Sequence, residues 1–245
     1  MVAAEILGLA PWEAVLAVVI VFIGSATQAS IGIGLGLMAA PTLSLIDPVL
    51  APVPQVLMVL PLTMLMAWRE RAHADMRGVP WVLAGRLPGA LIGLGLLSIA
   101  SDRTLDIAIA VLVLAGVAIR ASSIQIKRNA GTEVLVGTFA GTASMVASIG
   151  GPPMALLFQR ERAETIRATL GVVFTVGVVV TIVGRAVSGL VTADDVAVAA
   201  LLFPAMVAGY LISIPLASRV SEAFVRNGIL VVSTVAAAGL IVRAI

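Results

Sequence analysis

Eight long apolar segments run along the chain, separated by short stretches that carry most of the charge. Most of these segments are close to the roughly 20 residues that one helix needs to cross the hydrocarbon core of a bilayer. They cover residues 11–46, 52–68, 79–100, 104–122, 133–158, 168–187, 196–217 and 223–243. The pattern predicts an all-α integral membrane protein with several transmembrane helices.

Segments one and five differ from the others because glycine interrupts each of them near its middle. The first is also too long for a single helix. The interruptions read GSATQASIGIGLG at 24–36 and ASIGGPP at 147–153. Glycine lets a chain unwind, and proline cannot donate to a helix ladder. We expect both segments to be re-entrant, entering the membrane and returning to the same side. The alternative is a pair of single kinked helices.

The chain divides into two halves that resemble each other. Residues 1–125 hold segments one to four and residues 126–245 hold segments five to eight, in a single membrane domain. The tetrapeptide Ala-Ser-Ile-Gly occurs at 29–32 and again at 147–150, each time inside the broken segment that opens its half. Internal repeats of this kind are typical of secondary transporters.

The basic residues give the chain a predicted orientation. If segments one and five are re-entrant, one side of the membrane carries many more Lys and Arg residues than the other. The first side has Arg69, Arg71, Arg77, Arg120, Lys127, Arg128, Arg160, Arg162, Arg167, Arg219 and Arg226, and the second has Arg103, Arg185 and Arg243. Such a bias marks the cytoplasmic side and places the N-terminus outside. Each half then has one re-entrant segment and three crossings. Because three is odd, the second half begins on the opposite side of the membrane, so the halves are predicted to be inverted repeats.

Composition supports a membrane protein and argues against other classes. Hydrophobic residues make up 60% of the chain and charged residues 11%, against about 25% charged in an average soluble domain. The net charge is only +2, and the basic residues fall in short clusters without interleaved aromatic residues. This pattern argues against a nucleic-acid partner. The chain has no cysteine and one histidine, His73, in a charged stretch. We therefore expect no metal site, no cofactor and no enzymatic nucleophile.

The two interruptions are the candidate binding site. Non-helical backbone at membrane depth is tolerated where it lines a cavity, and a helix that restarts there points free N–H groups at an anion. Small hydroxyls and one amide surround the breaks and can donate to an oxyanion. The candidate residues are Ser25, Thr27, Gln28, Ser30, Gly32 and Gly34 in the first break, and Ser144, Ser148, Gly150, Gly151, Pro152 and Pro153 in the second. Close helix packing is the preferred interpretation of Gly24, Gly137 and Gly141.

A few charged and polar residues near segment interiors have two interpretations. Arg86 and Arg185 either extend to the interface by snorkelling or attract the anion at a cavity mouth. Gln55 and Gln159 either face the cavity or cap loops. No carboxylate falls in the middle of a segment, which disfavours coupling to protons or sodium through a buried acid. The membrane potential alone favours anion export by about 2.3 kcal/mol per charge per 100 mV.

The two interruptions also resemble known motifs. IGIGLGLMAAPTL at 31–43 and ASIGGPPMALLF at 147–158 are similar to the paired glycine-proline motifs of the TauE/SafE family of sulfite exporters, and the resemblance covers nearly the whole chain. It implies a multi-pass permease of the bacterial inner membrane for small sulfur-containing or organic anions. It also implies that Gly36 and Pro41 join Gly32, Gly34 and residues 150–153 as site-forming backbone.

One departure from the family pattern widens the expected substrate range. Many members have an Asn-Lys pair after the first motif, whereas residues 52–58 read PVPQVLM here. We therefore expect an exporter of a small anion, such as sulfite, a sulfonate or a related organic anion, that works by alternating access. The alternatives are a non-transporting membrane subunit, an intramembrane enzyme or a passive channel. The partners expected are the anion and lipid, and homo-oligomerisation is left open.

Overall fold

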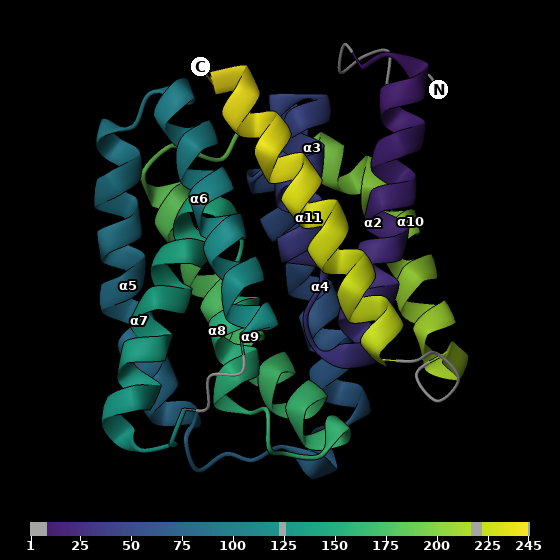
Figure 1. Cartoon of the computed structure of the whole chain (residues 1–245). Helices are drawn as coiled ribbons and strands as arrows, with labels where there is room; N and C mark the ends of the chain where they lie inside the picture. The colour runs from purple at the N-terminus through teal and green to yellow at the C-terminus, as the bar shows by residue number, and fades with distance from the viewer. Residues whose placement is uncertain (1–8, 123–125, 217–221, 245) are drawn as a thin grey trace.

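The computed structural model describes residues 9–122, 126–216 and 222–244, and within them the chain is helical apart from short connections (Figure 1). The predicted all-α class is confirmed. The helices are α2 (Pro11–Ile31), α3 (Leu35–Ile46), α4 (Val53–Arg69), α5 (Val79–Ile99), α6 (Asp102–Ala121), α7 (Ala130–Ala147), α8 (Gly151–Leu157), α9 (Ala163–Val187), α10 (Ala193–Leu216) and α11 (Glu222–Ala244), with 3-10 turns at Pro48–Leu50 and Arg71–His73.

Several helices begin where the sequence supplies a cap. Pro11 occupies the first turn of α2, where its missing N–H costs nothing, and the Glu13 carboxylate accepts from the Ala10 amide at 2.8 Å. The Asn129 side chain caps α7 by accepting from the Thr132 amide at 3.0 Å. These local signals explain why the boundaries lie close to the ends of the apolar segments.

Seven helical stretches in the described residues are long and apolar enough to cross a membrane. Six of them match the segments expected to cross once. The seventh is α2, whose 21 residues would span about 31 Å by themselves. The first interrupted segment therefore has one arm of full membrane length and a shorter returning arm, which the sequence pattern did not indicate.

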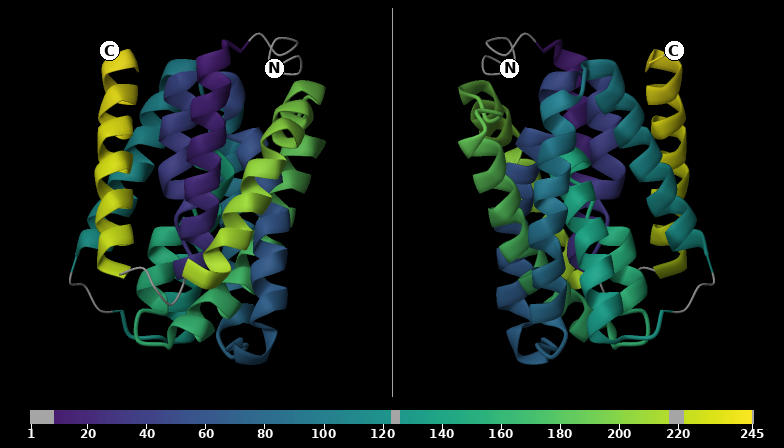
Figure 2. Two further views of the ribbon diagram at one scale, coloured as in Figure 1. Left: turned by 90° about the vertical axis from the view of Figure 1, so that its right-hand side faces the viewer. Right: turned by 90° about the vertical axis from the view of Figure 1, so that its left-hand side faces the viewer.

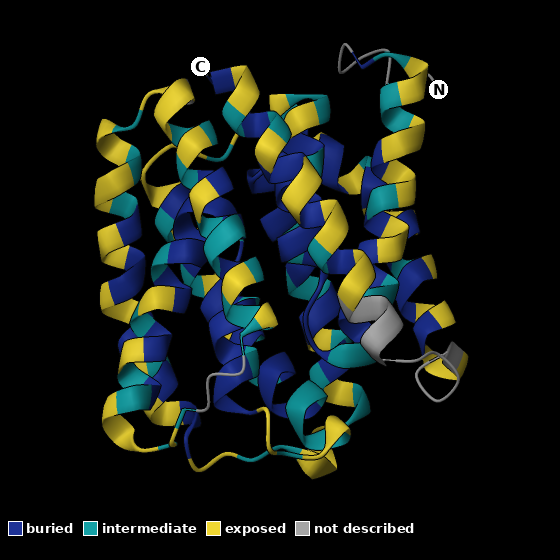
Figure 3. Ribbon diagram, in the orientation of Figure 1, coloured by how far each residue is buried: buried dark blue, intermediate teal, exposed yellow. Residues whose placement is uncertain are grey.

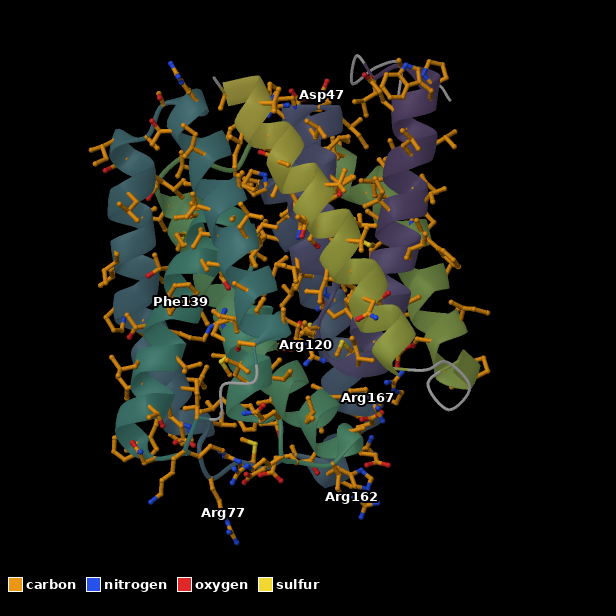
Figure 4. The ribbon with its side chains drawn as sticks, in the orientation of Figure 1. Asp47, Arg77, Arg120, Phe139, Arg162 and Arg167 are labelled. Carbon is orange, nitrogen blue, oxygen red and sulfur yellow. The ribbon has the colours of Figure 1, made fainter. Side chains whose placement is uncertain are left out.

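Both interrupted segments are helical hairpins rather than kinked helices. α3 turns back along α2, so that a methyl group at Gly24 would lie 3.2 Å from the Cα atom of Leu35. α8 likewise returns toward the start of α7, where Arg128 Nη1 lies 3.0 Å from Glu161 Oε1. The first hairpin ends near Asp47 and the second near Arg162, at opposite ends of the molecule (Figure 4). That the two halves are inverted repeats stays a prediction, as does the division at residue 125.

The two hairpin turns fall at different places in the repeated tetrapeptide. In the first, Gly32 and Gly34 have φ values of 93° and 153°, which glycine adopts readily. In the second, the left-handed residue is Ser148, at a φ of 60°, and Gly150 has ordinary helical geometry. A non-glycine residue in this region is uncommon. The matching sequences therefore do not imply matching backbone.

Glycines set the close packing of α5 against α7, which lie side by side in Figure 1. Methyl groups at Gly137 and Gly141 would lie 2.2 Å and 2.5 Å from the carbonyl oxygens of Val82 and Arg86. Small residues commonly allow such approach between membrane helices. The packing interpretation of Gly24, Gly137 and Gly141 agrees with these contacts, and it fixes the part of α5 that carries Arg86.

A pair of alanine substitutions on α5 tests this packing. A methyl group at Gly89 would lie 2.1 Å from the carbonyl oxygen of Thr138, whereas nothing lies within 4 Å at Gly95. We expect Gly89→Ala to lower the melting temperature by several degrees, because the two backbones must separate. Gly95→Ala should leave it unchanged or raise it, since alanine is the better helix former. Equal melting temperatures for the two variants would contradict the packing.

Buried residues gather in the centre of the bundle and exposed residues on its flanks (Figure 3). The side views show α10 crossing α2, against which it packs (Figure 2). The core contains three clusters, represented by Leu62, Phe158 and Ile109. Large apolar residues such as Leu91 and Val235 point outward, where lipid surrounds a membrane protein. Arg77, Arg162 and Arg167 lie together at one end, called here the basic end, and Asp47 lies at the other (Figure 4). Arg219 lies outside the described residues.

Candidate functional site

A small cavity, about 40 Å³ in volume, lies where the two hairpin turns meet. Such a space can hold a few water molecules or a small anion. We call it the central cavity. Its lining comes from both hairpins and from α4, α5 and α9: Gln28, Ile33, Gly34, Gly36, Leu37, Val59, Arg86, Ser144, Ser148, Gly150, Gly151, Pro152, Phe174 and Val178. None of these side chains is acidic.

Arg86 is the only charged residue in this lining. Its side chain is 2% exposed, and Nη2 donates to the Ser144 hydroxyl at 3.0 Å. Nε and Nη1 have no hydrogen-bond partner. The guanidinium also stands 5.8 Å from the centre of the Phe174 ring. A buried cation with two unused donors and no acidic residue in its cavity is costly unless a ligand pairs with it.

The first hairpin adds further donors to the central cavity. α3 begins at Leu35, and its first turn, including Gly36 and Leu37, lines the space. The amides of a first helical turn have no acceptor within their own helix, and the helix dipole is positive there. The Leu35 amide donates to Gln28 Oε1 at 3.1 Å, which holds the turn against α2.

The hairpin turns come into direct contact beside the cavity. A methyl group at Gly36 would lie 2.5 Å from the carbonyl oxygen of Ser148. Glycine is required there because two segments of backbone approach each other. The Ser148 hydroxyl then donates to the carbonyl oxygen of Pro52 at 2.9 Å, tying the second turn to the start of α4.

Arginines from other helices bind the carbonyl groups that end α2. Arg69 Nη2 donates to the Ala29 carbonyl at 2.6 Å, and Arg167 Nη1 to the Ser30 carbonyl at 3.2 Å. Arg167 also pairs with Glu70 at 2.8 Å. These contacts neutralise the negative end of the α2 dipole.

Arg185 binds the carbonyl groups at the end of α7 in a similar way. Its side chain is 3% exposed and donates to the carbonyl oxygens of Met145 and Val146. Arg185 therefore binds the end of α7 and lies outside the lining of the central cavity. The snorkelling interpretation is wrong for both Arg86 and Arg185, because neither side chain reaches the surface.

A cluster of charges joins the ends of the second hairpin at the basic end. Arg128, ahead of α7, pairs with Asp75 and Glu133 at 3.0 Å and 3.2 Å and stacks over the Phe158 ring at 4.5 Å. Partial burial acts to raise the pKa of Asp75, but hydrogen bonds from the Arg77 amide and from Arg128 outweigh it and hold that pKa below its ordinary value. The cluster fixes the connection between the hairpin and α5.

Besides Arg86, eight of the residues expected from the sequence or from the family resemblance line the central cavity. They are Gln28, Gly34, Gly36, Ser144, Ser148, Gly150, Gly151 and Pro152. A methyl group at Gly150 would lie 2.4 Å from Ser144 Oγ and 3.4 Å from Arg86 Nη1. The candidate residues nearest the turns are thus brought together from both halves.

Other expected residues lie elsewhere. Ser25 faces α10, where its Cβ atom would be 2.9 Å from a methyl group at Gly209, and Thr27 packs against Gly34. The Ser30 hydroxyl donates back to the Ala26 carbonyl at 2.7 Å, so it is not directed at a ligand. The remaining three lie outside the cavity lining: Gly32, Pro41 and Pro153.

Sequence reasoning did not identify the apolar wall of the cavity. Val59, Phe174 and Val178 come from α4 and α9, and nothing in their local sequence separates them from neighbouring core residues. Arg86 carried a recognisable signal, because an ionisable residue inside an apolar segment is usually functional. Its central position depends on the glycine packing of α5 against α7.

Comparison with protein families agrees with this architecture. The family model described as sulfite exporter TauE/SafE matches residues 16–240. The chain belongs to the sulfite exporter TauE/SafE family. The match covers both hairpins and the central cavity, and it makes this a multi-pass membrane protein of a transporter family. Comparisons with curated proteins and with solved structures gave no match.

Proposed function

We propose that this protein exports a small anion, such as sulfite, a sulfonate or a related organic anion, across the bacterial inner membrane by alternating access at the central cavity. The observation that carries the proposal is Arg86, a buried guanidinium with two donors free and no acidic residue beside it. The basic end faces the cytoplasm in this proposal.

The chemistry of the cavity favours an oxyanion. A guanidinium presents its N–H groups in a plane that matches the paired oxygens of a carboxylate, sulfite or sulfonate. Ser144 and the first turn of α3 supply neutral donors close by. An anion bound here would gain charge-assisted hydrogen bonds and would offset the desolvation of Arg86.

The contacts between the hairpin turns and their neighbours support a carrier rather than an open channel. Arg69 and Arg167 bind the carbonyl groups at the end of α2. Ser148 bonds to Pro52, and Gly36 lies against the Ser148 carbonyl oxygen. A carrier can break and remake contacts of this kind as it moves between its two open states.

Anion-induced stabilisation of the purified protein tests the proposal. The panel contains sulfite, sulfate, taurine, sulfoacetate and simple carboxylates. An anion present at about 100 times its Kd should stabilise the folded state by about 2.7 kcal/mol and raise the melting temperature. The same anion should then show saturable counterflow in proteoliposomes. No stabilisation and no flux with any of these anions would overturn the proposal, whereas flux without counterflow would indicate a channel.

A further inference from the structure

Gln55 is a buried amide for which the fold provides no partner. Its side chain is 0% exposed, and both Nε2 and Oε1 lack a hydrogen bond. Buried polar groups are nearly always paired, and an amide left unpaired costs free energy. Among the described residues only Arg86 also has two buried side-chain atoms without a partner. The loop-capping interpretation of Gln55 is wrong, because the side chain bonds to no loop.

The position of Gln55 on α4 relates it to two cavities. Residues 52, 55 and 59 fall on one face of a helix, because their spacing is three and seven residues. Val59 lines the central cavity. Pro52 lines a second cavity, about 740 Å³ in volume, at the end of the molecule opposite the basic end. Gln55 is in neither lining, but it lies on this helix face between a residue of each cavity.

The second cavity continues the line of cationic groups that begins at Arg86. Arg185 and Arg243 both line it, together with Asp106, which pairs with Arg243 at 2.7 Å. Arg86 bonds to Ser144, and Arg185 bonds to the next residue, Met145, so the two guanidiniums contact consecutive positions on α7. A hydrogen bond joins the two cavity walls, from the Ser148 hydroxyl, in the central lining, to the Pro52 carbonyl, in the second.

We propose that the anion leaves the central cavity toward the second cavity along this face of α4, and that the Gln55 amide binds it in transit. The two N–H groups of Nε2 donate to the oxyanion, and Oε1 accepts from water that accompanies it. The inference rests on the proposed function, because it assigns the route of the same ligand. In this inference, Gln55 contacts the anion as it moves between the cavities and not while it is bound in the central cavity.

Gln55→Met separates this role from a structural one. Methionine has a similar length and shape but cannot donate a hydrogen bond. We expect sulfite flux into proteoliposomes to fall at least tenfold, while sulfite-induced thermal stabilisation stays within twofold of the wild type. The melting temperature without ligand should be unchanged or higher, because an unpaired amide is removed. A lower melting temperature with unchanged flux would overturn the proposal and indicate a structural residue.

Ser233 on α11 provides a matched control. Its hydroxyl is also buried and unpartnered, and like Gln55 it is in the lining of neither cavity. It lies on α11, however, and not on the face of α4 that carries Pro52 and Val59. Ser233→Ala should leave sulfite flux and stabilisation unchanged. If wild-type protein shows neither sulfite binding nor flux, the proposed function and this inference both fail. If wild-type protein binds and transports sulfite but Gln55→Met transports it equally well, only this inference fails.

Chemical labelling provides a second measurement that does not depend on transport. The chain contains no cysteine, so single cysteines can be introduced without removing others. We expect a water-soluble methanethiosulfonate to modify Gln55→Cys in membranes at least tenfold faster than Ser233→Cys, because only the first lies on a path that water enters. Equal rates for the two cysteines would overturn the assignment of Gln55 to the path.

Discussion

Replacing Arg86 with methionine is expected to abolish anion-induced stabilisation and to reduce flux at least 30-fold. The estimate follows from losing a buried charge partner, which typically costs about 2–5 kcal/mol of binding. The protein should still fold. Its melting temperature without ligand should be unchanged or higher, because a buried guanidinium with two unpaired nitrogens no longer has to be desolvated. Thermal unfolding with and without sulfite measures both effects.

Two further variants sharpen this test. Arg86→Lys keeps a positive charge but not the planar pair of donors, so we expect weakened rather than abolished binding. Arg103→Met removes an exposed arginine on α6 and should change neither quantity. If Arg86→Met still binds sulfite with wild-type affinity, the central cavity is not the anion site.

Arg185→Met should have the opposite effect on stability. Arg185 donates to the carbonyl oxygens of Met145 and Val146 at the end of α7, and its removal leaves these buried groups without their partner. Each unsatisfied group costs about 1–3 kcal/mol, so we expect a loss of about 3 kcal/mol in the free energy of unfolding. The melting temperature should fall by roughly 6–12 °C. Calorimetry of the purified variant measures the change.

The lysine variant again separates charge from geometry. Arg185→Lys can neutralise the negative end of the α7 dipole but cannot bind both carbonyls in the same way, so an intermediate loss is expected. If Arg185→Met has wild-type stability but strongly reduced flux, this prediction is contradicted. Arg185 would then contact the anion in the second cavity rather than hold the end of α7.

The sequence predicted the helices well because their signals are local. Apolar segments of membrane length, Pro11 at the start of α2 and Asn129 at the start of α7 each specify structure through neighbouring residues. The two hairpins also followed from local sequence, since glycine interruptions of long segments are visible directly. What the pattern missed was the full length of α2, because hydropathy does not distinguish two arms of one apolar segment.

The site was predicted only in part because its geometry depends on distant contacts. Ser144 and Ser148 face the cavity, whereas Ser25 and Ser30 face other parts of the protein, although all four lie near a break. Their direction is set by which helix packs beside them. The missing partners of Arg86 and Gln55 are likewise a property of the assembled bundle. A single sequence can mark such residues as unusual but cannot show whether they are paired.

The helix α9 holds both hairpin turns at once. Arg167 near its start binds the end of α2, and Arg185 in its last turn binds the end of α7, about 27 Å away along the helix axis. A rigid rod attached at both ends transmits displacement between them. A shift of α9 along its axis would therefore displace both hairpin turns together and couple their movements mechanically.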